Sequence, residues 1–127
     1  MTTTIEPRTL ACGPITRTTL ALFAGASGDH NPIHIDLDVA RAAGMDDVFA
    51  HGMLSMAYLA RLVTEVAPQA ELRALTARFV AITPVHAKPT CTAAVTSVED
   101  GVTTLALSVA LEDGTVTLTG TATLAPA

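Results

Sequence analysis

The part of the chain after Pro68 alternates apolar and polar residues with a period of two, and this pattern limits the fold more than any other feature. A period of two is typical of β-strands that bury one face. The pairs Asp100-Gly101 and Asp113-Gly114 interrupt the pattern, and Asp-Gly supplies the positive φ values that hairpin turns require. We therefore predict an antiparallel meander, with strands over 72–81, 90–98, 105–111 and 115–124.

A long apolar helix is expected directly before these strands. Every residue from Met53 to Val63 except Ser55 and Arg61 is apolar or tyrosine. A helix at a protein surface carries apolar residues on one side only, so we expect this one to be buried on most of its circumference and to end at Pro68. A buried helix followed by a meander is an α+β architecture, and a chain of 127 residues fits a single domain over 1–127.

The first third of the chain predicts three shorter elements: a strand over 5–12, a helix over 19–26 and a helix over 39–43. The hydroxyl of Thr16 or Thr18 can cap the first helix, and the carboxylate of Asp36 or Asp38 can start the second. The chain between these two helices is therefore free to form a loop.

The composition bears on partners and compartment. Hydrophobic residues make up 50% of the chain and charged residues 15%, so we expect a second subunit to cover part of the apolar surface. The net charge of −5 and the lack of a basic block argue against nucleic acid and anionic membranes as partners. Residues 1–7 do not resemble a secretory signal, and no apolar run is long enough to span a bilayer. Cys12 and Cys91 stand in separate segments, which indicates two buried thiols in a reducing cytoplasm.

The loop between the two short helices carries the chemistry. Pro32 excludes a regular helix, and Gly28 permits a sharp turn, so Asp29 and His34 can fold back toward one point. A carboxylate and an imidazole placed together can share a proton transfer. His30 is expected to be solvated. It lies four residues from His34, but Pro32 denies this pair the helix that a metal site would need, so no metal is expected.

Gly52 opens the long apolar helix, where unpaired N–H groups and the positive end of the helix dipole can stabilise a developing negative charge. The alternative for Gly52 is close packing. Asn31 is either a turn former or a residue that orients the loop, and His51 can brace the turn before the helix. Arg78 and Lys88 are either solvated cations or the groups that meet phosphates of coenzyme A or of acyl-carrier pantetheine.

Two blocks of the sequence resemble one family. Residues 28–34 read Gly-Asp-His-Asn-Pro-Ile-His with Ala40 six positions later, and residues 51–53 read His-Gly-Met. Both are similar to the MaoC-like (R)-specific enoyl-CoA hydratases and 3-hydroxyacyl-thioester dehydratases. This resemblance implies a hot-dog fold, in which an antiparallel sheet wraps around a central helix. It also implies an acyl thioester substrate and no further cofactor.

The resemblance gives the candidate residues roles. Asp29 and His34 would activate the water that adds to C3 of a trans-2-enoyl thioester, the Gly52 amide would face the thioester carbonyl, and Asn31 and His51 would support them. Some relatives carry a hydroxyl residue eight positions after this glycine, where the present chain has Ala60.

We expect an enzyme that assembles as a homodimer. A hot-dog thioesterase and a subunit of a heterodimeric dehydratase are the alternatives. The presence of both Asp29 and His34 argues against a purely structural subunit.

Overall fold

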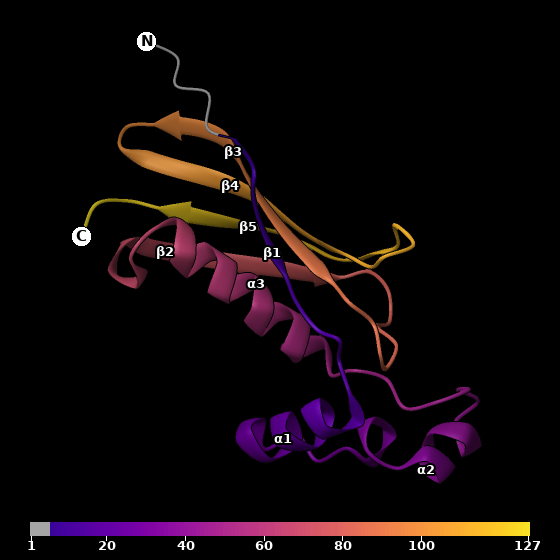
Figure 1. The fold of residues 1–127 in the computed structure, drawn as a ribbon. Coiled ribbons are helices and arrows are strands. Elements are labelled where there is room, and N and C mark those ends of the chain that lie inside the picture. The colour runs from indigo at the N-terminus through magenta and orange to yellow at the C-terminus, as the bar shows by residue number, and fades with distance from the viewer. Residues whose placement is uncertain (1–5) are drawn as a thin grey trace.

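The computed structural model describes residues 6–127, which form one five-stranded antiparallel sheet with helices packed beside it (Figure 1). Across the sheet the strand order is β1-β3-β4-β5-β2. The strands are β1 (Arg8–Ala11), β2 (Leu72–Phe79), β3 (Thr90–Glu99), β4 (Val102–Ala110) and β5 (Val116–Leu124). The predicted meander is confirmed for β3, β4 and β5, but it is wrong for β2, which pairs with β5 at the far edge of the sheet and not with β3. The first residue of the strand expected over 5–12 lies outside the described residues.

The hairpin between β3 and β4 has the predicted turn, since Asp100 and Gly101 both have positive φ angles of 52° and 78°. The alternation expected in β5 is wrong at its start, because Thr117 is buried and Val116 is 38% exposed. A β-bulge explains the difference. Val109 pairs with Leu118 while the next residue pairs with Val116, so Thr117 is an extra residue that turns inward. Its hydroxyl donates to the Val109 carbonyl at 3.4 Å.

The long helix α3 (Gly52–Val66) packs against one face of the sheet (Figure 1). Its buried side chains Leu59, Leu62 and Val63 join a core built mostly from β3, β4 and β5. This is the α+β hot-dog architecture. In the part of the chain that is described, no helix has both the length and the apolar content needed to cross a bilayer.

The expectation that α3 is buried on most of its circumference is wrong for the single chain. Met53 is 54% exposed, and Ala57 and Arg61 are also exposed along the same side of the helix. The sheet covers one side of α3, and the N-terminal helices cover only its beginning, through Leu54. A partly apolar stripe therefore faces outward.

The N-terminal helices are α1 (Arg17–Ser27) and α2 (Leu37–Ala42), with short 3₁₀ helices η1 (Pro32–His34) and η2 (Gln69–Glu71) at the loops. Two candidate cap residues were predicted for each helix. The structure shows that Thr16 caps α1 and Asp36 caps α2. The two helices and the start of α3 enclose a second apolar cluster: Ile15, Leu20, Ala40, Val48, Ala50, Leu54 and Val85.

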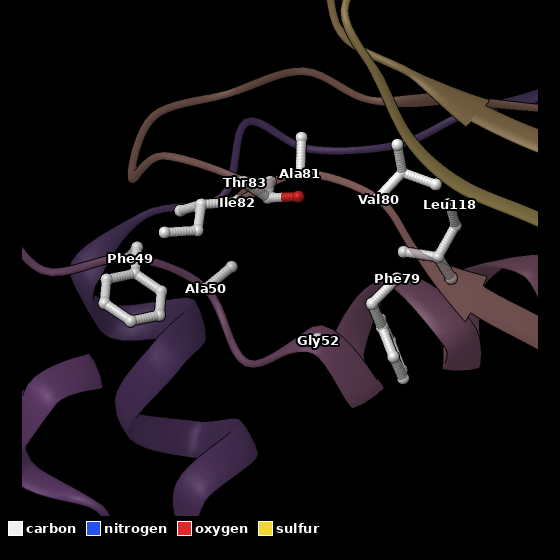
Figure 2. A pocket seen from close by; sticks show the side chains of 9 residues that line it. All are labelled: Phe49, Ala50, Gly52, Phe79, Val80, Ala81, Ile82, Thr83 and Leu118. Carbon is white, nitrogen blue, oxygen red and sulfur yellow. The ribbon is translucent and has the colours of Figure 1, made fainter.

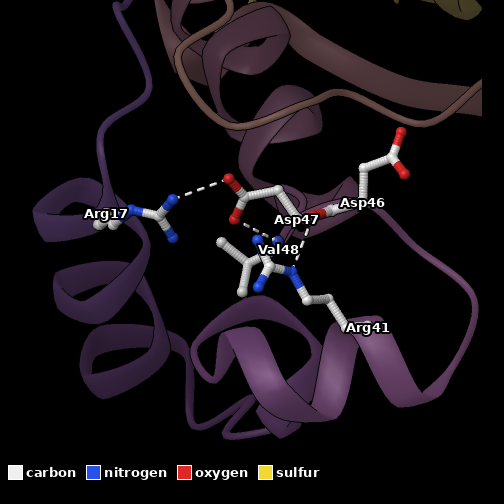
Figure 3. Close-up of polar contacts among 5 residues, drawn as sticks. All are labelled: Arg17, Arg41, Asp46, Asp47 and Val48. Atoms are coloured by element: carbon white, nitrogen blue, oxygen red, sulfur yellow. Dashed lines mark hydrogen bonds and ion pairs between the residues drawn. The ribbon is translucent and has the colours of Figure 1, made fainter.

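An ion pair ties α1 to the connector before α3 (Figure 3). Arg17 Nη2 lies 2.7 Å from Asp47 Oδ2, and the other carboxylate oxygen of Asp47 accepts from the Val48 amide at 2.7 Å. Arg41 of α2 reaches the carbonyl of Asp46 at 3.5 Å. The Arg17 hydrogen bond holds the pKa of Asp47 below its ordinary value. This network fixes the segment that leads into the site.

The two cysteines are free, but the structure places them together and differs from the sequence prediction in one respect. Cys91 is fully buried, whereas Cys12 is only half-buried. Cys12 directly follows β1, which pairs with β3, and its Sγ donates to the Leu10 carbonyl at 3.8 Å; Leu10 in turn pairs with Cys91. Burial raises the pKa of Cys91 to about 12, so this thiol stays protonated at neutral pH.

Candidate active site

The loop after α1 turns sharply and is held by its own side chains. Gly28 closes α1 in the left-handed conformation, with a φ of 79°. The Asp29 carboxylate then accepts from the Asn31 amide at 3.2 Å, and the Asn31 side chain accepts from the Ile33 amide at 3.2 Å. Asn31 therefore acts as the turn former that the sequence allowed. Pro32 begins the 3₁₀ helix η1, which ends at His34.

His34 is buried and held by the connector before α3. Its Nδ1 lies 2.7 Å from the carbonyl oxygen of Phe49, and its ring meets the Phe49 ring edge-on at 5.0 Å. A carbonyl oxygen only accepts, so Nδ1 carries the proton. In the neutral imidazole, Nε2 is then the basic nitrogen.

The prediction that Asp29 and His34 come together is borne out in geometry. One carboxylate oxygen of Asp29 and one ring nitrogen each of His34 and His51 lie within 4.8 Å of one another. Asp29 is exposed, while both histidines are buried. The site thus combines a solvent-facing carboxylate with two buried imidazoles, and we call these three residues the Asp-His-His cluster.

His51 has more contacts than its sequence position indicated. Only 1% of the residue is exposed, and Nε2 lies 3.1 Å from the backbone carbonyl of Asp29. Its ring stacks on His34, with 4.0 Å between centroids and 26° between planes, and meets Phe23 edge-on at 4.9 Å. Burial lowers the pKa of His51 below its ordinary value, and the bond to the Asp29 carbonyl only partly opposes this.

One carboxylate and two imidazoles at this spacing raise the question of a metal ion. His34 Nδ1 and His51 Nε2 are both engaged with carbonyl oxygens. The remaining lone pairs lie in ring planes that are nearly parallel and stacked. The spacing of these ligand atoms alone would allow an ion to be held, so the expectation that no metal binds stays a prediction.

Gly52 is the first residue of α3, and its surroundings support the packing interpretation. A Cβ atom built there would lie 2.9 Å from the ring of Phe79, so the close approach of this ring requires glycine. The preceding residue, His51, points its side chain to the loop instead of capping the helix. The role of the Gly52 amide toward a carbonyl stays a prediction.

A pocket of about 320 Å³ lies beside the connector that leads into α3 (Figure 2). Its lining is mostly apolar: Phe49, Ala50, Gly52, Phe79, Val80, Ala81, Ile82, Thr83 and Leu118. The cluster itself does not line this pocket. The two share the backbone from Phe49 to Gly52, since Phe49 lines the pocket while its carbonyl binds His34. The Ala50 amide donates to the Thr83 carbonyl at 2.9 Å and fixes this shared wall.

The two basic residues singled out from the sequence lie elsewhere. Arg78 and Lys88 are exposed, and neither lines the pocket. Side chains alternate along β2, so Arg78 leaves the opposite face of the sheet from Ala77, which packs on the core, and from Phe79. A phosphate-binding role for either cation stays a prediction.

Sequence reasoning missed Ser55. It received no role from its place in the apolar helix, yet its hydroxyl is fully buried on α3 four residues after His51. Within residues 6–127, the buried side-chain atoms without a hydrogen-bond partner are Ser55 Oγ and His51 Nδ1. The spacing of four was a usable signal, because residues at i and i+4 share one side of a helix.

The sequence profile of one family, described as "MaoC like domain", matches residues 3–117. This chain belongs to the MaoC-like family. A 3-hydroxyacyl-thioester dehydratase Z from Mycobacterium tuberculosis is 44% identical over 48 residues, which are 38% of this chain and 32% of that protein. The match therefore spans about a third of the curated relative.

Solved structures agree on the fold of this MaoC-like chain. An (R)-hydratase from A. caviae superimposes with a TM-score of 0.86 at 21% identity, covering 99% of this chain and 98% of the other. The R-hydratase PhaJ1 from Pseudomonas aeruginosa gives 0.86 at 26% identity, covering 95% and 80%. A chain of the ChsH1-ChsH2 complex from Mycobacterium tuberculosis gives 0.86 at 24% identity over 100% of both. The hot-dog assignment is confirmed.

Proposed function

We propose that this protein adds water to trans-2-enoyl thioesters to form (R)-3-hydroxyacyl thioesters, or catalyses the reverse dehydration. One observation carries the proposal. In a MaoC-like chain, an Asp29 carboxylate oxygen and a His34 ring nitrogen lie within 4.8 Å, beside the first residues of α3. At this separation a single water molecule can hydrogen-bond to both groups.

The reaction assigns each group a task. His34 Nδ1 is occupied by the Phe49 carbonyl, so Nε2 accepts the proton of a water that Asp29 orients. The water oxygen bonds to C3 of the enoyl thioester, and the π electrons move onto the thioester oxygen. The Gly52 amide at the start of α3 donates to that oxygen, where the helix dipole favours negative charge. The proton then passes from the imidazolium to C2, which completes the addition of water.

The substrate is proposed to be an acyl thioester of coenzyme A or of an acyl carrier protein, and no further cofactor takes part. The apolar pocket of about 320 Å³ beside Gly52 supports an acyl chain as the bound group. Arg78 and Lys88 are kept as candidate contacts for the carrier phosphates. Ala60 stands where some relatives have a hydroxyl, so the chemistry here is assigned to Asp29 and His34 alone.

We also propose a homodimer in the cytoplasm. Exposed apolar side chains line the pocket, with Phe79 at 52%, Val80 at 55% and Ile82 at 50%, and Met53 on the outer side of α3 is 54% exposed. Strand β2 is an edge of the sheet and carries unpaired backbone groups that a second chain can meet. The free thiols of Cys12 and Cys91 support a reducing compartment. Light scattering on the chain expressed alone tests the assembly. A monomer that becomes active only with a second protein would favour the heterodimer.

The deciding experiment mixes the purified protein with crotonyl-CoA and longer trans-2-enoyl-CoAs. Hydration removes the ultraviolet absorbance of the conjugated double bond, and the chirality of the product is then determined. Release of free thiol instead would identify a thioesterase.

Asp29→Asn and His34→Ala are expected to lose on the order of 10²–10⁴ in kcat. His30→Ala, in the same loop, and Asp38→Asn, both at exposed residues, are the matched controls and should keep activity. Full activity in either site variant would refute the proposal.

A further inference from the structure

His51 and Ser55 form a pair of buried polar groups that the proposed reaction does not use. His51 is 1% exposed and Ser55 is 0% exposed. Among the described residues, His51 Nδ1 and Ser55 Oγ are the buried side-chain atoms that lack a hydrogen-bond partner. Leaving such a group unsatisfied costs about 1–3 kcal/mol, so two of them at the beginning of one helix require an explanation.

The bond to Asp29 determines the protonation of His51. The Asp29 carbonyl can only accept, so His51 Nε2 carries the hydrogen. The ring is neutral when Nδ1 holds a lone pair, and Nδ1 then needs a donor. A charged ring would instead place a second cation against His34 when His34 takes a proton, since the two rings stack at 4.0 Å.

Ser55 is the donor that the helix brings to this place. His51 is the N-cap of α3 and Ser55 is the fourth residue of the helix, so the two Cα atoms lie about one turn apart on the same side of the helix. A serine hydroxyl has a hydrogen to give, and the orphaned Nδ1 has a lone pair to receive it. Buried polar groups that do not touch are commonly joined by one internal water.

We propose that Ser55 and His51 are positioning residues, in which the Ser55 hydroxyl donates to His51 Nδ1 through one internal water, and His51 Nε2–H donates to the Asp29 carbonyl. This relay rests on the proposed function. It runs from α3 to the loop and fixes the backbone of Asp29 and the plane on which His34 stacks. His51 stays neutral, so His34 can gain and lose the proton without a neighbouring cation.

Ser55→Ala tests the relay, with Thr64→Ala as the matched control. Thr64 also has a hydroxyl on α3, but it is exposed and bonds to the Arg61 carbonyl. The relay predicts that Ser55→Ala lowers kcat about tenfold with KM little changed, because Asp29 and His34 are less well placed. Thr64→Ala should leave both constants unchanged. If the hydroxyl were unsatisfied, its removal would raise Tm and leave kcat as it was, which would overturn the proposal.

A spectroscopic measurement separates the relay from the reaction. In protein labelled with ¹⁵N-histidine, His51 should show a protonated Nε2 and an Nδ1 resonance shifted by an accepted hydrogen bond. Ser55→Ala should move that Nδ1 resonance toward the value of a free lone pair, and Thr64→Ala should not. An Nδ1 resonance identical in the wild type and Ser55→Ala would exclude the relay. This readout does not need turnover, so it decides the relay even if no enoyl thioester is hydrated.

Discussion

The imidazole rings of His34 and His51 stack face to face, with 4.0 Å between their centroids and 26° between their planes. The two residues reach this contact from different elements, His34 from η1 and His51 from the start of α3. Each ring is fixed by a backbone carbonyl, of Phe49 and of Asp29 respectively. The stack therefore joins the loop that carries Asp29 to the helix that carries Gly52.

The burial of His51 makes stability depend on pH. Its pKa is lowered in the folded protein, mainly by burial, so the unfolded chain binds this proton more readily. Stability should consequently fall as the pH drops through the unfolded value of about 6.5. His51→Gln removes this contribution. Urea unfolding from pH 8 to pH 5 should show that the stability advantage of the wild type over His51→Gln shrinks on acidification. A constant difference across the range would contradict the assignment.

The Arg17–Asp47 ion pair should also lose its contribution to stability on acidification, but at lower pH. Arg17 lowers the pKa of Asp47, so the carboxylate stabilises the fold above its unfolded pKa, and this contribution is lost as the pH falls through the folded value. Asp47→Asn should lower Tm at neutral pH, and the difference from the wild type should vanish in acid. Because the pair is exposed, added salt should also reduce the difference. Asp46→Asn is the matched control, since Asp46 contributes its carbonyl to Arg41.

The cap of α1 predicts a stability effect that is independent of pH. The Thr16 hydroxyl accepts from the Thr19 amide at 3.1 Å, and the Thr19 hydroxyl accepts from the Thr16 amide at 3.2 Å. Thr16→Ala removes this reciprocal pair and should cost about 0.5–2 kcal/mol in urea unfolding. Thr18→Ala, at an exposed position in the first turn, should cost much less. Equal losses in the two variants would show that the cap is not what matters.

The fold could be predicted because its signals are local. The period of two marks the strands, the Asp100-Gly101 pair marks a hairpin, and Thr16 marks the start of α1, each within a few residues. The bulge at Thr117 could not be predicted, because it depends on how β5 pairs with β4 and leaves no trace in the alternation of β5 itself.

The part of the site that lies within one loop could be predicted from the sequence, whereas its contacts with α3 could not. Asp29 and His34 share one loop that Pro32 and Gly28 force to bend, so their approach followed from the sequence. The bond from His51 to the Asp29 carbonyl joins residues 22 apart in sequence, and it depends on how the loop docks on α3. The exposed side of α3 was missed for a related reason, since an apolar pattern does not say whether the same chain or a partner covers it.

Gly52→Ala tests whether the close contact between Gly52, at the start of α3, and the Phe79 ring in the pocket matters for activity. The new Cβ would lie 2.9 Å from the Phe79 ring, and the ring is 52% exposed, so the ring can swing aside with little loss of stability. We expect Tm to change little, whereas kcat/KM should fall because the displaced ring reshapes the pocket next to the proposed carbonyl site. Adding Phe79→Ala should recover much of the loss if crowding is the cause. Gly25→Ala is the control: a Cβ there meets nothing within 4 Å, so it should stabilise α1 by roughly 1 kcal/mol and leave activity unchanged.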